Sequence, residues 1–370
     1  MGHISLPANA EIWELSVTGC YISSDELDDA IKTINFDKSA PPSGFLPFMV
    51  WEYGLGKLTP YVPNLYSLLS DGIVWQRVRG TPDAVARALS WLNTSASIEQ
   101  AWHGRTWWNS FQLRFDTLPE NDDPLLERIE AVTALSVPKR SQLRRGVHHY
   151  DAGCLTADYK ALDNTMLDRE SGIQLTPAGT IWSFGRTHIF KHELTEAEGL
   201  AIGNWIDLVE GQSLRWIDMT YPWVQANFPW EASAITQRKA LLAGWFNDQT
   251  LYVTLKKNNG DVIGYRRCRA CHSVSQTYGG SYSFDGVRYQ PRLGGTTVYV
   301  EALTDFDDAK NFEALSISLL VGGVLREGVK PGCLWLEPQD ISGGHEIAHQ
   351  AITLNLRASV REQFKFMVRF

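Results

Sequence analysis

The first 150 residues place apolar side chains mostly three or four positions apart, which is the spacing of an amphipathic α-helix. A capping-box sequence, Ser23-Ser24-Asp25-Glu26, opens the first such stripe, which ends near Asn35. Pro63 and Pro82 stand near two later helix starts, where a missing N–H leaves no helical hydrogen bond unmade. Helices are therefore predicted at residues 45–54, 63–79, 82–92 and 124–136, with one or two strands at 98–117.

From Thr180 onwards the apolar spacing shortens towards two residues, which is the period of a β-strand. Leu251, Val253 and Leu255 alternate up to Asn258-Asn259-Gly260, and alternation resumes beyond this tripeptide. Asn-Gly between two such runs predicts a β-hairpin. Further strands are predicted at 181–184, 188–190, 296–303, 312–321, 351–357 and 363–370, with helices at 195–209 and 230–246.

Together these patterns predict an α+β fold. We expect a mostly helical N-terminal domain at residues 1–150, a mixed α/β middle region at 151–248 and a β-rich C-terminal domain at 249–370. A chain of 370 residues is also long for one hydrophobic core, which favours several domains.

Aromatic content adds a second observation, since the chain holds 14 tryptophans and 13 tyrosines. Such side chains bury much area at modest entropic cost, so they favour large contact surfaces with other proteins. The same residues also serve as bulky core filler, and composition alone does not separate the two roles.

Charge and cysteine usage exclude several classes of partner. The net charge is −8 and no basic stripe is present, so nucleic acid is not an expected partner. No run approaches 18 apolar residues and no secretory leader is visible, so no membrane association is expected. Five scattered cysteines in such a chain predict reduced thiols and synthesis in a cytoplasm.

One short motif matches a zinc enzyme. His345-Glu346-Ile347-Ala348-His349 satisfies the H-E-x-x-H pattern, which on a helix places two imidazoles on Zn²⁺ with Glu346 as general base. Ser342-Gly343-Gly344 precedes it without a helical stripe, and the residues after it follow strand spacing. The pattern thus favours a polar loop running into a strand, with a zinc hydrolase as the alternative.

Cys268-Arg269-Ala270-Cys271-His272 matches the attachment pattern of c-type haem, a chemistry of exported proteins. A structural zinc would need two more ligands, for which Cys154, Cys333, His272 and His345 are candidates. The cysteines end a strand-like run, which favours two plain thiols at a sheet edge. The His148-His149 pair and the acidic pairs at 28–29, 122–123 and 307–308 favour surface roles, so no catalytic residue, metal or cofactor is predicted.

The order of elements in the N-terminal part resembles the tail protein I family of contractile-tailed bacteriophages. Leu6-Pro7-Ala8-Asn9-Ala10 resembles that family's opening, and Leu46-Pro47-Phe48-Met49-Val50-Trp51 resembles its first helix. A later helix start, Arg79 through Val85, and the aromatic run Trp107 to Phe115 follow in the family's order. The closing segment, Leu126 to Leu143, ends the resemblance, which covers about residues 5–143.

Two positions depart from the family pattern. Gln142 stands where the family's exit motif has His, and Gly54-Leu55-Gly56-Lys57 replaces a more acidic turn. The resemblance implies a non-enzymatic baseplate wedge protein in the virion tail, made in the bacterial host cytoplasm. It also implies contact with two copies of a larger wedge protein (tail protein J type) and with baseplate hub or sheath-proximal proteins.

The resemblance also directs attention to particular tryptophans. The helices at 45–54, 63–79 and 82–92 are the candidates for an inter-subunit bundle, and its predicted anchors are Trp51, Trp75, Trp91, Trp102, Trp107 and Trp108. Residues beyond 155 are expected to dock a tail fibre, its adaptor or a neighbouring wedge protein, with sugar binding by aromatic side chains as a rival. A virion-associated zinc hydrolase and a cytosolic adaptor unrelated to phage remain the alternatives for the whole chain.

Overall fold

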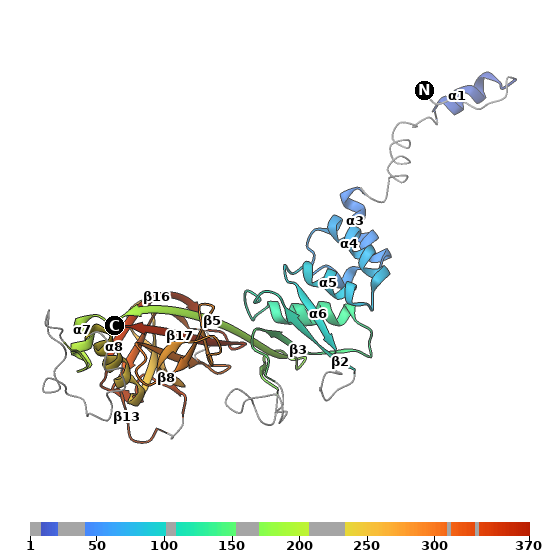
Figure 1. Cartoon of the computed structure of the whole chain (residues 1–370). Coiled ribbons are helices and arrows are strands. Elements are labelled where there is room, and N and C mark those ends of the chain that lie inside the picture. The colour runs from blue at the N-terminus through green and yellow to red at the C-terminus, as the bar shows by residue number, and fades with distance from the viewer. Residues whose placement is uncertain are drawn as a thin grey trace. The chain divides into compact units, whose positions relative to one another are not determined.

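The computed structural model describes residues 9–20, 41–100, 109–152, 170–206, 234–308, 312–329 and 333–370 (Figure 1). It contains both helices and strands, which confirms the α+β class. The chain forms two compact units: unit 1 is Met1–Thr94 with Ala131–Arg140, and unit 2 is Ser95–Glu130 with Ser141–Phe370. The domain boundaries near residues 150 and 248, which rest on composition and period, stay predictions.

Unit 1 is built from helices. Its segments are α1 (Ile12–Cys20), η1 (Ser43–Phe45), α3 (Leu46–Glu52), η2 (Gly56–Leu58), α4 (Leu65–Val78), α5 (Pro82–Ser90) and the end of α6 (Leu125–Ser136). Asn64 begins α4 because its side-chain Oδ1 accepts hydrogen bonds from the backbone N–H groups of Tyr66 and Ser67. Gly80 lies between α4 and α5 with φ of +91°, a conformation that glycine adopts without strain.

The core of unit 1 forms where α4 meets the segments on either side of it. Gly72, in the middle of α4, packs against Leu55, and a Cβ at this glycine would lie 2.9 Å from the leucine Cδ1. Trp75 is also buried, and its indole N–H donates to the Ser136 hydroxyl at 3.0 Å. Trp91 lies beside this indole, with 6.2 Å between ring centroids. Small and aromatic residues of one helix thus fix its packing on both sides.

Two sheets make up most of unit 2. Within the described residues the larger has ten strands in the order β1-β2-β3-β5-β17-β11-β8-β10-β9, with β4 paired to β5. Their bounds are β1 (Ala96–Gln100), β2 (Ser110–Phe115), β3 (Gln142–His148), β4 (Ile173–Gln174), β5 (Ile181–Glu193), β8 (Ala270–Gln276), β9 (Tyr282–Phe284), β10 (Val287–Pro291), β11 (Thr297–Leu303) and β17 (Val360–Arg369).

The strand β5 is the central connection of this sheet (Figure 1). Its first residues pair in parallel with β3, from Arg145 opposite Ile181 to His148 opposite Phe184. Its remaining residues pair in parallel with β17, beginning with Val360 opposite Phe184. Two short strands were expected at 181–184 and 188–190, but the change of partner at Phe184 leaves the strand unbroken.

The smaller sheet has the strand order β14-β7-β6-β12-β16 among the described residues. Its bounds are β6 (Leu251–Lys256), β7 (Val262–Arg267), β12 (Glu313–Val321), β14 (Trp335–Leu336) and β16 (His345–Asn355), and a separate pair is formed by β13 (Val324–Leu325) and β15 (Ile341–Ser342). The predicted hairpin joins β6 to β7, where the Lys257 N–H donates to the Asp261 carbonyl at 2.9 Å.

A hydrophobic core in unit 2 lies between the two sheets. It combines residues of β6, β12 and β16 with the alternate residues Phe364, Phe366 and Val368 of β17. The helix α8 (Ala234–Trp245) and the turn η6 (Phe246–Asp248) add Ala243 and Phe246, and α7 (Glu196–Ala201) lies near β16. Strand alternation therefore assigns one side-chain row of β17 to this core and the other row to the opposite face of the large sheet.

The segment at 345–350 corrects one expectation. A polar loop was expected there, but β16 begins at His345 and pairs with β12. Ala348 has φ of +55°, and the register of the pair shifts nearby. This irregularity breaks the two-residue alternation of apolar side chains, and the sequence pattern therefore hides the first half of the strand.

Candidate functional site

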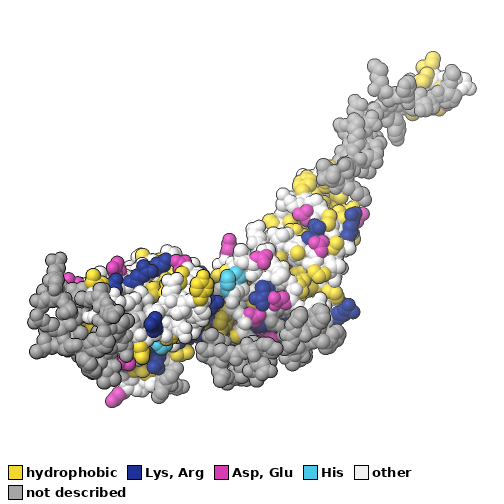
Figure 2. All heavy atoms as spheres, in the orientation of Figure 1, with side chains coloured by type: hydrophobic (Ala, Val, Ile, Leu, Met, Phe, Trp, Pro, Cys, Tyr) yellow, Lys and Arg dark blue, Asp and Glu magenta, His cyan; other side chains and the backbone are white. Residues whose placement is uncertain are grey.

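An exposed aromatic row in unit 1 begins at Phe45, the last residue of η1, and continues along α3. Phe45, Phe48 and Trp51 are 44%, 70% and 83% exposed, and hydrophobic side chains gather over these helices in Figure 2. Residues three apart lie on one face of a helix, so these three rings form a single row, here called the α3 aromatic row.

The opposite face of α3 accounts for this arrangement. Leu46, Met49 and Val50 are buried, so they hold the helix against the rest of unit 1. A helix with apolar residues on both faces buries only one of them within this unit, and the other is typical of a surface that another protein covers.

The six predicted tryptophan anchors fall into three groups. Trp51 lies in the α3 aromatic row. Trp75 is buried beside Ser136 and Trp91 is half-buried against it, so both pack inside unit 1 in this conformation. The other three, Trp102, Trp107 and Trp108, lie outside the described residues. Sequence spacing alone did not single out Phe45 and Phe48, although both stand at helical spacing from Trp51.

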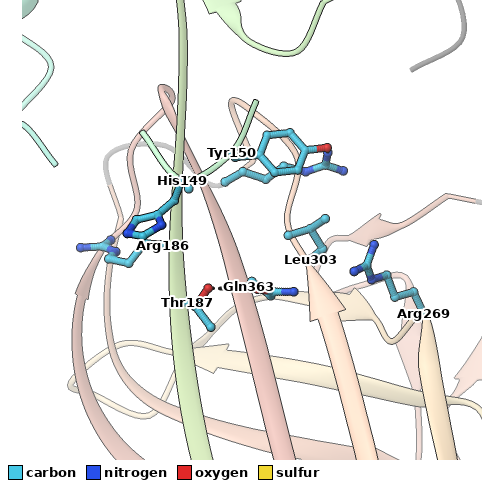
Figure 3. A pocket seen from close by; sticks show the side chains of 9 residues that line it. His149, Tyr150, Arg186, Thr187, Arg269, Leu303 and Gln363 are labelled. Carbon is cyan, nitrogen blue, oxygen red and sulfur yellow. Dashed lines mark hydrogen bonds between the residues drawn. The ribbon is translucent and has the colours of Figure 1, made fainter. Parts of the chain in front are cut away.

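Unit 2 contains a cavity of about 210 Å³ on the face of the large sheet away from the core between the sheets (Figure 3). Here called the arginine pocket, its lining includes Tyr150, Thr187, Arg269, Leu303, Arg361 and Gln363. These residues come from β5, β11 and β17, from the turn before β8 and from the turn after β3, which lie far apart in the sequence. Thr187 and Gln363 face each other on adjacent strands, and the threonine hydroxyl donates to the glutamine Oε1 at 2.9 Å.

Two buried carboxylates form ion pairs with arginines that line this pocket. Glu301 accepts hydrogen bonds from Arg269 Nε at 2.9 Å, from Gln363 Nε2 at 2.8 Å and from the Tyr299 hydroxyl. Burial acts to raise the pKa of Glu301, but the Tyr299 hydrogen bond and the Arg269 charge outweigh it and leave this pKa lowered. The glutamate is therefore ionised and neutralises Arg269.

Glu362 plays the same part for Arg186, whose backbone borders the pocket. Its carboxylate accepts from Arg186 Nε at 3.0 Å and contacts His188 Nε2 at 2.9 Å. Burial again acts to raise the pKa of Glu362. The hydrogen bonds from His188 and Arg186 lower this pKa by more than burial raises it, so the net shift is downwards. Arg186 thus adds no uncompensated charge.

Arg361 differs from these two arginines. Its Nε donates to the Thr304 carbonyl at 2.6 Å, its Nη1 donates to the Tyr150 hydroxyl, and its guanidinium lies over the Tyr150 ring at 4.8 Å from the centroid. The nearest carboxylate is that of Asp305, which is half exposed, with 3.9 Å between Nε and Oδ1. The Arg361 side chain is only 14% exposed, so this long ion pair is screened mainly on the Asp305 side, and it compensates the positive charge in part.

The His345–His349 segment does not have the geometry of a zinc hydrolase. In a strand, side chains four residues apart are on the order of 10–13 Å apart, whereas one Zn²⁺ needs both imidazoles within its first shell. Glu346 is engaged with Lys256 Nζ at 2.6 Å and with the Ser318 hydroxyl at 2.8 Å. The pattern in this chain is therefore a strand segment with a salt bridge.

The cysteines of the Cys268–Cys271 motif pack against the core between the sheets. Burial raises the pKa of Cys268 well above its ordinary value and raises that of Cys271 to about 12. Both are protonated thiols at neutral pH, which is the state least suited to redox or metal chemistry. Across the described residues, no group of three or more His, Cys, Asp or Glu side chains is arranged to hold a metal ion.

Comparisons with known proteins place the N-terminal part of the chain. None of the described helices is both long and apolar enough to cross a membrane. A search of curated proteins gave no match. A scan against family models matched residues 6–140 to the family described as phage tail protein (Tail_P2_I). This match, which includes the α3 aromatic row, confirms over these residues the resemblance to a phage tail protein family that the sequence pattern indicates.

Proposed function

We propose that this protein is a structural component of a contractile phage baseplate, in which it bridges copies of a larger wedge protein of the tail protein J type. The observation that carries the proposal is the family match over residues 6–140, with an exposed aromatic row inside the matched segment. In the infection cycle of the phage, the protein would be synthesised in the host cytoplasm and then assembled into the baseplate of the virion tail.

The α3 aromatic row supplies the contact chemistry for this role. Phe, Tyr and Trp side chains each bury about 150–250 Å² when covered, and they are enriched among the residues that dominate binding energy. Phe48 and Trp51 are the most exposed of the row, so covering them gains the most apolar burial. The predicted anchor at Trp51 therefore acts together with its two phenylalanine neighbours.

The mechanism is conformational rather than catalytic. A baseplate wedge holds the sheath extended, then rearranges after host contact, which requires an interface with two packed arrangements. Baseplate hub or sheath-proximal proteins would meet the same assembly from other sides. The β-rich part beyond residue 155 would serve as the attachment for a tail fibre, its adaptor or a neighbouring wedge protein.

Co-expression of the full chain with its larger wedge partner tests the bridging role. Trp51→Ala combined with Phe48→Ala is expected to weaken the complex by about 30-fold or more, because each truncation removes a buried aromatic anchor. Leu200→Ala is the matched control, since it truncates another exposed apolar side chain (61%) outside the family match. An unchanged dissociation constant in the double variant, with folding intact, would exclude the α3 aromatic row as the wedge interface.

A further inference from the structure

Unit 2 contains a feature outside the proposed wedge contact at the α3 aromatic row, the arginine pocket. Three arginines border it in a chain of net charge −8. Two of them are matched by the buried carboxylates Glu362 and Glu301, to which they donate hydrogen bonds. The third, Arg361, forms a longer ion pair with the half-exposed Asp305, at 3.9 Å from Nε to Oδ1. Arg361 is thus the arginine of the pocket whose charge is compensated least, so an anion is expected to bind beside it.

The hydrogen-bonding groups of Arg361 and Tyr150 point to the same conclusion. Nε and Nη1 of Arg361 are used by Thr304 and Tyr150, whereas Nη2 makes no hydrogen bond to any described residue and is accessible. The Tyr150 hydroxyl accepts from Arg361, so its own proton remains for another acceptor. A guanidinium and a phenol proton side by side are the donors that a carboxylate prefers.

The remaining lining groups suit a small hydroxylated ring. Leu303 and the ring of Tyr150 supply apolar surface, while the Thr187 hydroxyl and the Gln363 amide lie on adjacent strands. Figure 3 shows their side chains around the same space, with Arg269 at its border. The cavity of about 210 Å³ has the size of one sugar ring, which is too short for an extended peptide segment.

We propose that the arginine pocket binds a hexuronic acid residue of an acidic glycan, with its carboxylate on Arg361 and Tyr150 and its hydroxyls toward Thr187 and Gln363. A phosphate dianion would need a second uncompensated cation, which the pairing of Arg269 with Glu301 does not leave. The inference concerns unit 2 alone and stands whether or not the α3 aromatic row joins a wedge partner.

Ligand binding to the full chain tests this directly, with saturation-transfer NMR and calorimetry at low salt. Sodium glucuronate is expected to bind one molecule per chain, and glucose, acetate and inorganic phosphate are expected to bind at least tenfold more weakly. Tyr150→Phe keeps the ring under the guanidinium and removes the hydroxyl, so it is expected to weaken glucuronate about tenfold. Arg361→Gln is expected to abolish binding, and the exposed Arg292→Gln serves as the control.

Each other result overturns the proposal. Equal binding of glucose would show that the pocket does not recognise the carboxylate. Equal binding of acetate or phosphate would show that it does not recognise the sugar ring. Binding unchanged in Tyr150→Phe, or preferred binding of an acidic peptide, would assign the pocket to other chemistry. If Arg361→Gln fails to fold, as shown by circular dichroism, the Tyr150→Phe result decides alone.

Discussion

Arg357 and Asp122 form an ion pair between residues 235 positions apart, with 2.9 Å from the arginine Nε to the aspartate Oδ1. The same carboxylate accepts the backbone N–H of Ser359 at 3.2 Å, and both ionic side chains are mostly buried. A loop inside the family-matched segment is thereby held to the turn that begins β17. We expect this contact to be among the strongest polar links within unit 2.

Removing one partner of this pair should therefore destabilise the protein. Asp122→Ala leaves Arg357 and the Ser359 N–H without their acceptor, and the expected cost is about 2 kcal/mol of unfolding free energy. The measurement is urea unfolding followed by tryptophan fluorescence. Glu120→Ala, at a nearby exposed position, is expected to have no effect, and equal midpoints for the two variants would contradict the structural role of the pair.

Glu362 predicts how stability depends on pH. Its pKa is lowered in the folded state from an ordinary value of 4.5, so its ionised form stabilises the fold above that value. This stabilisation is lost as the pH falls from about 4.5 through the lower folded pKa. Glu362→Gln should be less stable than wild type at pH 7, and the difference should shrink below pH 4.5. Thermal unfolding from pH 7 to 3 measures it.

The exposed Glu313→Gln is the control for this experiment. A constant difference between Glu362→Gln and wild type at every pH would show that lost packing, rather than lost charge, causes the destabilisation.

Two helical glycines, Gly72 within α4 and Gly244 near the end of α8, should change stability in opposite directions when replaced by alanine. A Cβ at Gly72 would lie 2.9 Å from Leu55 Cδ1, and overpacking of this kind costs about 1–3 kcal/mol. Gly244 in α8 has no atom within 4 Å of the same position, so alanine there should stabilise by about 0.5–1 kcal/mol. Chemical unfolding of both variants gives the comparison, and stabilisation by Gly72→Ala would mean that Leu55 moves aside freely.

Thiol labelling should separate the cysteines. Burial raises the pKa of Cys271 to about 12 and that of Cys268 well above its ordinary value, so few thiolates form at pH 8. Cys333 is exposed and should react with iodoacetamide before Cys268 and Cys271 do. Peptide mass spectrometry measures each site in the native and the urea-unfolded protein. Labelling of Cys268 or Cys271 as fast as Cys333 in the native protein would contradict their burial.

Local signals in the sequence predicted the local structure. The helix at 63–79 appears as α4, which begins after the capping side chain of Asn64 and continues through Gly72. The Asn258-Asn259-Gly260 turn appears as the β6–β7 hairpin for the reason that the motif predicts. Both features depend on residues within a few positions of one another.

Contacts between distant residues left no such signal. The strand β5 pairs first with β3, 36 positions earlier in the chain, and then with β17, 176 positions later, and the spacing of apolar residues does not indicate which strands will pair. The arginine pocket is similar, since Tyr150 and Arg361 are separated by 211 positions. Arg361 stands in an ordinary alternating strand, and only the folded sheet shows that it lies against Tyr150 and forms a longer ion pair than Arg186 and Arg269 do.

The continuous pairing along β5 has a consequence for protein engineering. Strands β1 and β2, from the family-matched segment, and strands β11 and β17, from the C-terminal part, belong to one hydrogen-bonded sheet. A fragment cut after residue 150 would leave β3 with a bare row of amides and carbonyls, an open template for pairing with other chains. The C-terminal part therefore covers the edge of β3 and prevents other chains from pairing with it.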